Sequence, residues 1–250
     1  TPRIAFGVCS YQSSATIVRC LHSIVECCAE PERIEIRVFD NGSSDLSAQL
    51  ASNVLGEIAR GHSNFFGNLG NSGESVGRYQ SLRDSKAPLL GCRDPDVELK
   101  TPGIDLLLER LLMVRDVVAY ADPWCYKAWG EAKDGASAVH PITYAMLRAF
   151  TRRAFNMLCV PDERLVYGAV DLDVSIRAKL SKIEMHASPL LTLTHVPRTA
   201  HLKDEAHPKL TESIAALCAK WLGDEMRDPG AKEPWAKGVT AIEKEFGLRK

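Results

Sequence analysis

Short apolar runs alternate with amphipathic segments along the first half of the chain, and this alternation constrains the fold more than any other feature. The runs predict buried strands, and the segments between them have the apolar spacing of helices. The predicted strands cover 4–9, 34–39, 87–92 and 117–120, and the predicted helices cover 15–28, 46–60, 74–85 and 104–114. Strands that alternate with helices form a parallel sheet with right-handed crossovers. The sequence therefore predicts an α/β fold.

Polar loops follow three of the predicted strands, at residues 10–14, at 40–45 and at Asp94-Pro95-Asp96. The carboxyl ends of parallel strands share one edge of a sheet, and ligands bind beyond that edge. A Gly/Asn-rich segment at 64–73 is predicted as a further loop. These loops together predict a nucleotide site.

Asp94 and Asp96 are two carboxylates one residue apart at the end of a predicted strand. Such a pair offers hard oxygen ligands to Mg²⁺ or Mn²⁺. A metal held there could neutralise a diphosphate as it departs. An isolated pair of this kind often forms only a solvated turn, so the surrounding loops carry the prediction.

Composition excludes several other classes of protein. The chain has 250 residues, of which 45% are apolar and 25% charged, and its net charge is −1. No long basic tract favours nucleic-acid binding. No apolar run approaches the ~18 residues of a membrane span, so we expect no integral membrane contact. The eight cysteines form no CxxC pair, which predicts buried free thiols in a cytoplasmic protein. The N-terminal sequence is separately predicted to contain no secretory signal.

Several segments, taken in order, resemble the motifs of inverting, family-2-type glycosyltransferases of the GT-A fold. They are residues 38–45, which match "V-D-N-G-S-S-D"; 68–73, which resemble "N-x-G-x-x-G"; 94–99, which match the D-x-D strand end; 171–177, which resemble "E-D-x-D-L-x-x-R"; and Thr194-His195, which resembles the late strand ending in a metal-binding histidine. The resemblance covers about residues 4–196. One departure is Val170, which stands where the family has Glu.

The resemblance implies a mainly parallel central sheet flanked by helices. It implies a single GT-A domain over residues 1–200, with a nucleotide-binding half over 1–100 and an acceptor-binding half over 101–200. Residues 201–250 are predicted as a helical C-terminal extension. Within the acceptor-binding half, residues 124–141 are predicted as a loop, 142–155 as mixed or helical and 190–195 as a strand. Beyond this half, His201 and His207 are expected on a loop-like stretch.

The activity that the resemblance implies is transfer of a hexosyl group from a nucleoside-diphosphate sugar to the hydroxyl of a soluble glycan or small molecule. UDP is favoured over GDP or dTDP. Asp96 would be the main ligand of Mn²⁺ (or Mg²⁺), Asp94 would reach the metal or the ribose, and His195 would complete the coordination. The donor-binding candidates besides Asp94 are Ser10, Tyr11 and Asp40 near the base, Asn68 and Gly70 in the loop, and Arg78 near the diphosphate.

Asp171 is the candidate general base, which would take the proton from the acceptor hydroxyl as that oxygen attacks the anomeric carbon. Asp173 is the next candidate. A carboxylate at a helix start can also be only an N-cap. Trp124 and Trp129 flank the predicted acceptor loop, where indole rings could stack on a sugar or pack in a core.

Two other functions stay open. A nucleotidyltransferase would have an early loop rich in glycine and basic residues, and residues 10–14 contain neither Gly nor Lys. A non-catalytic descendant that binds a sugar nucleotide or a partner is kept open by Val170. Release of free nucleoside diphosphate would identify the glycosyltransferase, and release of pyrophosphate the nucleotidyltransferase.

Overall fold

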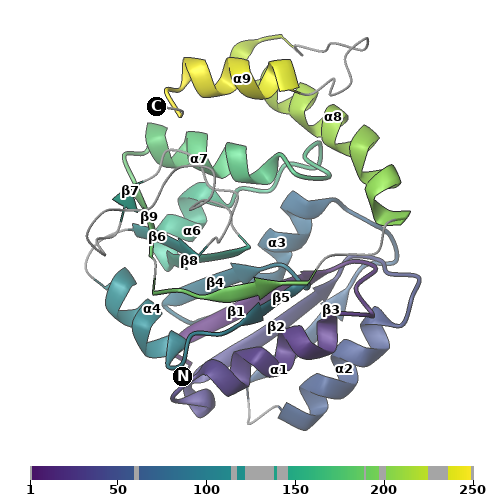
Figure 1. Ribbon diagram of the computed structural model, residues 1–250, viewed down its shortest axis with the longest axis vertical. Coiled ribbons are helices and arrows are strands. Elements are labelled where there is room, and N and C mark those ends of the chain that lie inside the picture. The colour runs from purple at the N-terminus through teal and green to yellow at the C-terminus, as the bar shows by residue number, and fades with distance from the viewer. Residues whose placement is uncertain are drawn as a thin grey trace.

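The computed structural model describes residues 2–58, 62–113, 117–121, 138–139, 146–188, 190–196, 201–224 and 236–248. The described strands form an eight-stranded sheet in the order β3-β2-β1-β4-β8-β6-β9-β7 (Figure 1). These strands are β1 (Ile4–Ser10), β2 (Ile34–Asp40), β3 (Ser63–Gly67), β4 (Leu89–Arg93), β6 (Val117–Ala121), β7 (Ala138–Val139), β8 (Leu147–Thr151) and β9 (Glu184–Ala187). A separate two-stranded ribbon pairs β5 (Val97–Leu99) with β10 (Leu193–His195).

The first four strands of the sheet are parallel to one another. β1 pairs with β2 and β4, and β2 pairs with β3, all in parallel register. The other half is mixed, because β8 lies antiparallel to β4 and β6, while β6 and β9 are parallel. The fold is therefore α/β with a mainly parallel central sheet flanked by helices, as predicted.

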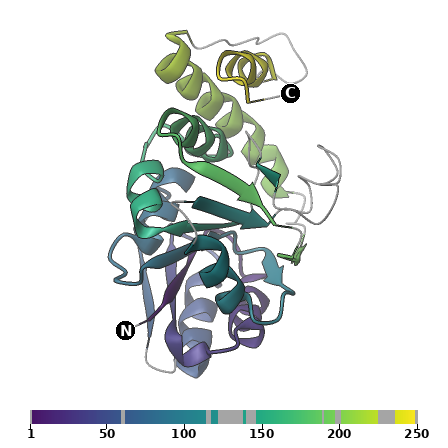
Figure 2. The same ribbon diagram turned by 90° about the vertical axis from the view of Figure 1, so that its left-hand side faces the viewer.

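Helices cover both faces of the sheet and divide the core into two clusters. One cluster joins β1 and β2 to α1 (Ile17–Cys27), α2 (Ser47–Ile58) and α4 (Ile104–Leu112). The other joins β4 and β8 to α3 (Glu74–Leu82), α6 (Arg152–Leu158) and α7 (Val170–Leu180). A short 3₁₀ turn, η1 (Pro31–Arg33), precedes β2. In Figure 2, α1 and α2 lie at one end of the molecule and the C-terminal helices at the other.

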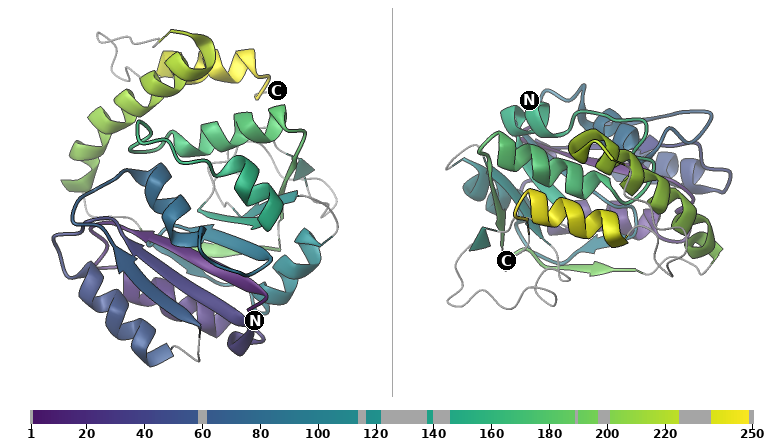
Figure 3. Two further views of the ribbon diagram at one scale, coloured as in Figure 1. Left: turned by 180° about the vertical axis from the view of Figure 1, so that it is seen from behind. Right: turned by 90° about the horizontal axis from the view of Figure 1, so that it is seen from above.

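The C-terminal helices α8 (His201–Leu222) and α9 (Ala236–Glu245) lie over α7, as the view from above in Figure 3 shows. They belong to the second core cluster, to which Ile214, Leu217 and Ile242 contribute buried side chains. Apolar burial thus packs the C-terminal helices on the layer that contains α3, α6 and α7.

Strand β1 shows how the sequence separates the two clusters. Ile4, Phe6 and Val8 point to the α1–α2 face, where they are fully buried. Ala5 points to the opposite face, as strand alternation requires. Gly7 lies under α3, and a Cβ atom there would come within 2.5 Å of Leu82 Cγ. The absence of a side chain at Gly7 therefore lets α3 approach β1 closely.

Two expectations about secondary structure are corrected. Residues 63–67 form the edge strand β3 and not a loop, because pairing with β2 stabilises a short, largely exposed segment that has no apolar alternation. Residues 147–151 form β8 before the helix α6 begins, which agrees with the mixed alternative for this stretch. His201 and His207 lie in the backbone of α8, which continues through Pro208. The strand β9 was not predicted, and Trp124 and Trp129 lie outside the described residues.

The described cysteines are free thiols. Burial raises the pKa of both Cys20 and Cys92 to about 11, so these thiols stay protonated near neutral pH. Among the described residues, no helix combines the length and the apolar character needed to cross a bilayer.

Two glycine substitutions test the packing of α3 on β1. Gly7→Ala should lower the free energy of unfolding by about 1–3 kcal/mol, because the new methyl group overpacks against Leu82. Gly56→Ala is the matched control, since no described atom lies within 4 Å of a Cβ at that position in α2. The control should gain up to ~1 kcal/mol from helix propensity. Urea denaturation measures both, and equal effects would show that α3 does not depend on Gly7.

Candidate active site

The candidate site lies at the carboxyl edge of the parallel strands. β1 ends at Ser10 and β2 at Asp40, and these two residues are paired in register. β4 ends at Arg93, so Asp94 and Asp96 follow directly beyond the same edge. Tyr11 begins the turn that leaves β1. The topology therefore brings the first three predicted loops together, as parallel pairing requires.

The loops after β1 and β2 are joined by hydrogen bonds. The Gln12 backbone N–H donates to Ser43 Oγ at 3.1 Å, and Gln12 Oε1 accepts from the Ser44 N–H at 3.2 Å. The Ser10 hydroxyl bonds to that of Ser13 at 2.7 Å, in a fully buried position. Ser10 therefore shapes the turn from a buried position, whereas Tyr11 is half-buried.

Asp40 organises the start of the loop after β2. Its two carboxylate oxygens accept hydrogen bonds from Ser43, one from the backbone N–H at 2.9 Å and one from the hydroxyl at 2.7 Å. Its backbone carbonyl accepts from the Asn68 N–H at 3.0 Å. Each carboxylate oxygen can still accept another bond, so the turn-forming role and a ligand-binding role are compatible.

Asn41 holds the Gly/Asn-rich loop, and sequence reasoning assigned it no role. Its Nδ2 donates to the carbonyl of Gly73 and to Asn71 Oδ1, each at 3.0 Å. Its Oδ1 accepts from the backbone N–H of Ser72 at 2.9 Å. Asn68 and Gly70, the predicted donor-binding residues, lie exposed on the loop that this side chain fixes. The sequence places Asn41 only inside a turn motif, where such distant partners cannot be seen.

Asp96 and His195 come together although they are far apart in sequence. His195 pairs with Val97 across the β5–β10 ribbon, and its Nε2 lies 3.5 Å from Asp96 Oδ2. The backbone N–H of Val196 also donates to the Asp96 carbonyl at 2.8 Å. A carboxylate oxygen and an imidazole nitrogen that face each other fit a shared divalent cation. Within the described part of the chain, no three His, Cys, Asp or Glu side chains gather into a fuller metal cluster.

Arg78, on α3, joins three acidic side chains. Its Nη2 lies 2.7 Å from Asp94 Oδ1 and 2.5 Å from Glu74 Oε1, and its Nη1 lies 3.3 Å from Asp171 Oδ1. Burial opposes the charge of Arg78, but Asp94 and Glu74 outweigh it and raise the pKa of Arg78 above its ordinary value. A fixed positive charge thus holds the D-x-D segment, α3 and α7 together.

Two further residues of this cluster were missed by sequence reasoning. Arg148, on β8, is 2% exposed and forms an ion pair with Asp171 Oδ1. Glu74 accepts a hydrogen bond from the Gly168 N–H at 2.7 Å, just before α7 begins. Neither residue belongs to a recognisable motif, and tertiary packing alone brings Arg148 to Asp171 and Glu74 to Gly168.

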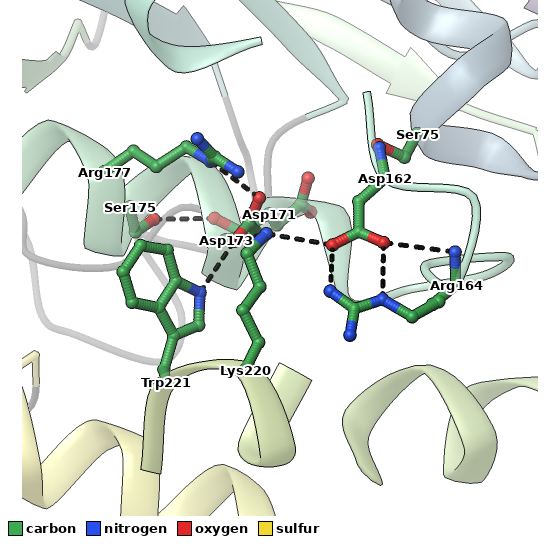
Figure 4. Close-up of polar contacts among 9 residues, drawn as sticks. All are labelled: Ser75, Asp162, Arg164, Asp171, Asp173, Ser175, Arg177, Lys220 and Trp221. Atoms are coloured by element: carbon green, nitrogen blue, oxygen red, sulfur yellow. Dashed lines mark hydrogen bonds and ion pairs between the residues drawn. The ribbon is translucent and has the colours of Figure 1, made fainter. Parts of the chain in front are cut away.

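Asp173 is directed away from this cluster and toward α8 (Figure 4). It is 3% exposed, and its Oδ1 accepts from Lys220 Nζ at 2.9 Å and from Trp221 Nε1 at 2.7 Å. Its Oδ2 accepts from Arg177 Nε at 2.8 Å. Asp171 and Asp173 therefore do different work, because Asp173 clamps α7 to the C-terminal helix.

A family model described as glycosyl transferase family 2 matches residues 6–160. The chain belongs to this family. The matched stretch includes Asp40, Arg78, Asp94 and Asp96, whereas Asp171 and His195 lie beyond it. No curated protein matches the sequence significantly.

Solved structures of glycosyltransferases share the fold of this family-2 chain. The mannosyltransferase PcManGT of Pyrobaculum calidifontis, solved with GDP-Man and Mn²⁺, is 17% identical, with a TM-score of 0.68 over 99% of this chain and 70% of that one. GalNAc-T7, solved with UDP, GalNAc and Mn²⁺, is 12% identical, with a TM-score of 0.67 over 99% and 55%. TarS 1–349 of S. aureus is 13% identical, with a TM-score of 0.65 over 98% and 72%. These likenesses show the GT-A fold.

The clamp around Asp173 predicts a stability defect in this family-2 glycosyltransferase. Asp173→Ala leaves Lys220 without its shorter carboxylate contact and leaves Trp221 Nε1 without its acceptor. Removing one partner of such a buried network should lower the free energy of unfolding by about 3 kcal/mol. Asp84→Ala is the control, because this carboxylate is exposed and its ion pair within the described residues is with its neighbour Arg83, so the substitution should cost less than ~0.5 kcal/mol. Equal losses in urea denaturation would contradict the clamp.

Proposed function

We propose that this glycosyltransferase depends on a divalent metal and inverts the anomeric configuration of the hexosyl group that it transfers. The donor would be a nucleoside-diphosphate sugar, UDP-linked in preference to GDP- or dTDP-linked, and the acceptor a hydroxyl of a soluble glycan or small molecule. The observation that carries the proposal is the convergence of Asp40, Asp94 and Asp96 at one sheet edge, with His195 Nε2 3.5 Å from Asp96. Among the solved structures of similar fold, one was obtained with GDP-Man and one with UDP, both with Mn²⁺, which supports the class of donor and of cation.

The base of the donor would lie at the ends of β1 and β2. Asp40 is held by Ser43, and its remaining lone pairs could accept a hydrogen bond from a ring N–H of uracil. Tyr11 offers a ring face in the adjoining turn. Asn68 and Gly70 would let backbone approach the nucleotide from the loop that Asn41 fixes.

Asp96 and His195 would hold the cation, and Mn²⁺ suits their mixed oxygen and nitrogen donors better than Mg²⁺ does. When bound, the cation would neutralise charge on the departing diphosphate. Asp94 is tied to Arg78 and would reach the ribose or the cation with its other oxygen. Arg78 would then act on the diphosphate mainly through the carboxylates that it positions.

Asp171 would act as general base. As the acceptor oxygen forms its bond to the anomeric carbon, its proton would pass to the Asp171 carboxylate, and the bonding electrons of the sugar–phosphate bond would leave with the diphosphate. Arg78 and Arg148 both make their closest contact with Asp171 Oδ1, so Oδ2 would take the proton. Direct displacement of this kind inverts the anomeric centre. The three donors that Asp173 binds on α7 and α8 favour Asp171 over Asp173 for this role.

A non-catalytic descendant that binds a sugar nucleotide or a partner is the second candidate. It is favoured by Val170 in place of the family's Glu and by the engagement of Asp171 with two guanidinium groups. Release of free nucleoside diphosphate in the presence of acceptor separates the two functions, since only the enzyme produces it.

Nucleotide titration tests the metal site. Calorimetric titration of UDP, GDP and dTDP, with Mn²⁺ or with EDTA, should show metal-enhanced binding of one of them. Asp96→Ala should weaken that binding at least ~10-fold in Mn²⁺, because a metal ligand is lost. In EDTA the variant should match the wild type, which is the internal control. Metal-dependent binding that survives in Asp96→Ala would refute the assignment of Asp96.

Transfer assays test the base. Asp171→Asn keeps the shape of the side chain but removes its basicity, so turnover should fall by about 10²–10⁴-fold. Nucleotide affinity should change by less than ~2-fold, because Asp171 contacts the acceptor and not the donor base. NMR of the product gives the anomeric configuration. Undiminished turnover in Asp171→Asn, or retention of configuration, would be incompatible with this mechanism.

A further inference from the structure

The helix α8 begins close to the candidate donor site, at the side of the molecule where the loops after β1 and β2 lie (Figure 1). Lys209, in its first half, places Nζ 5.9 Å from the centre of the Tyr11 ring. Both side chains are half-buried. This contact joins residues that are far apart in the sequence. It belongs neither to the cluster around Arg78 nor to the hydrogen bonds between Asp173 and α8.

We propose that Lys209 binds the phosphate groups of the donor nucleotide, which would make α8 part of the donor site. The inference rests on the proposed function, because it requires a nucleoside diphosphate at the edge formed by Tyr11 and Asp40. It adds a cation that none of the sequence motifs contains.

The position of Lys209 is set by contacts that α8 makes on the C-terminal side of this residue. Toward the C-terminus, Lys220 lies 3.0 Å from Asp162 and 2.9 Å from Asp173. Nearer to Lys209, Ser213 Oγ accepts from the Tyr167 N–H at 3.0 Å. Leu210 packs against Gly168, where a Cβ would come within 2.7 Å of Leu210 Cδ1. About 16 Å of helix axis, at ~1.5 Å per residue, separates Lys209 from Lys220, so the anchored helix fixes the lysine at the site.

The two arginines of the acidic cluster are already engaged by carboxylates. Arg78 is shared among Glu74, Asp94 and Asp171, and Arg148 pairs with Asp171. Both guanidinium groups are therefore already neutralised by carboxylates. Lys209 has no carboxylate partner in the part of the chain that the structure describes. Beside the cation that Asp96 and His195 would hold, Lys209 would add a positive charge on the Tyr11 side of the same edge.

The contact with Tyr11 would let the lysine side chain turn, so that its ammonium group moves from the ring to a phosphate group. A cation above an aromatic ring at about 6 Å is held only weakly. A lysine carries its charge on a flexible four-carbon stem, and an ammonium–phosphate contact is a charge-assisted hydrogen bond. In this scheme the nucleotide base replaces the ammonium on the Tyr11 face, and the ammonium turns to the phosphates of the same ligand.

The test compares ligands that differ only in phosphate. Calorimetry is done with the nucleoside, the monophosphate and the diphosphate of whichever base the wild type binds best among uracil, guanine and thymine. Lys209→Met should bind the diphosphate about 5- to 20-fold more weakly, while the affinity for the nucleoside is unchanged. Lys209→Gln removes the same charge and should behave alike, and Lys209→Arg should stay within ~3-fold of the wild type. Lys237→Met, on the exposed surface of α9, is the matched control.

Each result decides the matter. A loss confined to phosphate-bearing ligands, with unchanged melting temperature, supports the inference. Equal diphosphate affinity in the wild type and in both neutral variants overturns it and leaves the proposed function intact. A loss shared equally by the nucleoside also overturns it, because Lys209 would then act only on the Tyr11 ring. If the wild type binds no diphosphate, the inference falls together with the proposed function.

Discussion

The buried guanidinium of Arg78 is the interaction on which the site depends. It lies among Glu74, Asp94 and Asp171, and it brings together α3, the segment after β4 and the start of α7. Without a cation at the centre these carboxylates would repel one another at short range. The charge is also permanent, because an arginine surrounded by acids does not lose its proton. The acidic edge that would hold a cation is thus assembled at folding.

Around that centre, the loops at the sheet edge are held by side chains that bond to backbone. Asn41 fixes the loop before α3, Gln12 joins the loops after β1 and β2, and Glu74 holds the Gly168 N–H. Loops held in this way would need less ordering when a ligand binds, which would reduce the entropy lost on binding. The GT-A fold supplies the edge, and these polar side chains make it rigid.

The parallel half of the sheet and its acidic loops could be predicted because each predicted strand has a clear apolar run and its polar residues follow immediately. The edge strand β3 could not be predicted, because Asn64 and Gly67 are typical of a loop. The extended conformation of this segment depends on its pairing with β2. The helical start of α8 was obscured by Pro208 and by histidines. At the site, local motifs contain Asp94, Asp96 and Asp171. The cations Arg148 and Lys209 carry no local signal, since their partners come from distant elements.

The β5–β10 ribbon brings together the two residues of the proposed metal site before any cation binds. Asp96 and His195 are separated by a loop of about a hundred residues, and closing a loop of that length costs substantial chain entropy. Backbone pairing of Val97 with His195 and the bond from Val196 to Asp96 close it during folding. A cation that binds at the proposed site would therefore meet two donors that are already neighbours. Loss of its hydration shell, and not the search of one ligand for the other, would then limit the rate of binding.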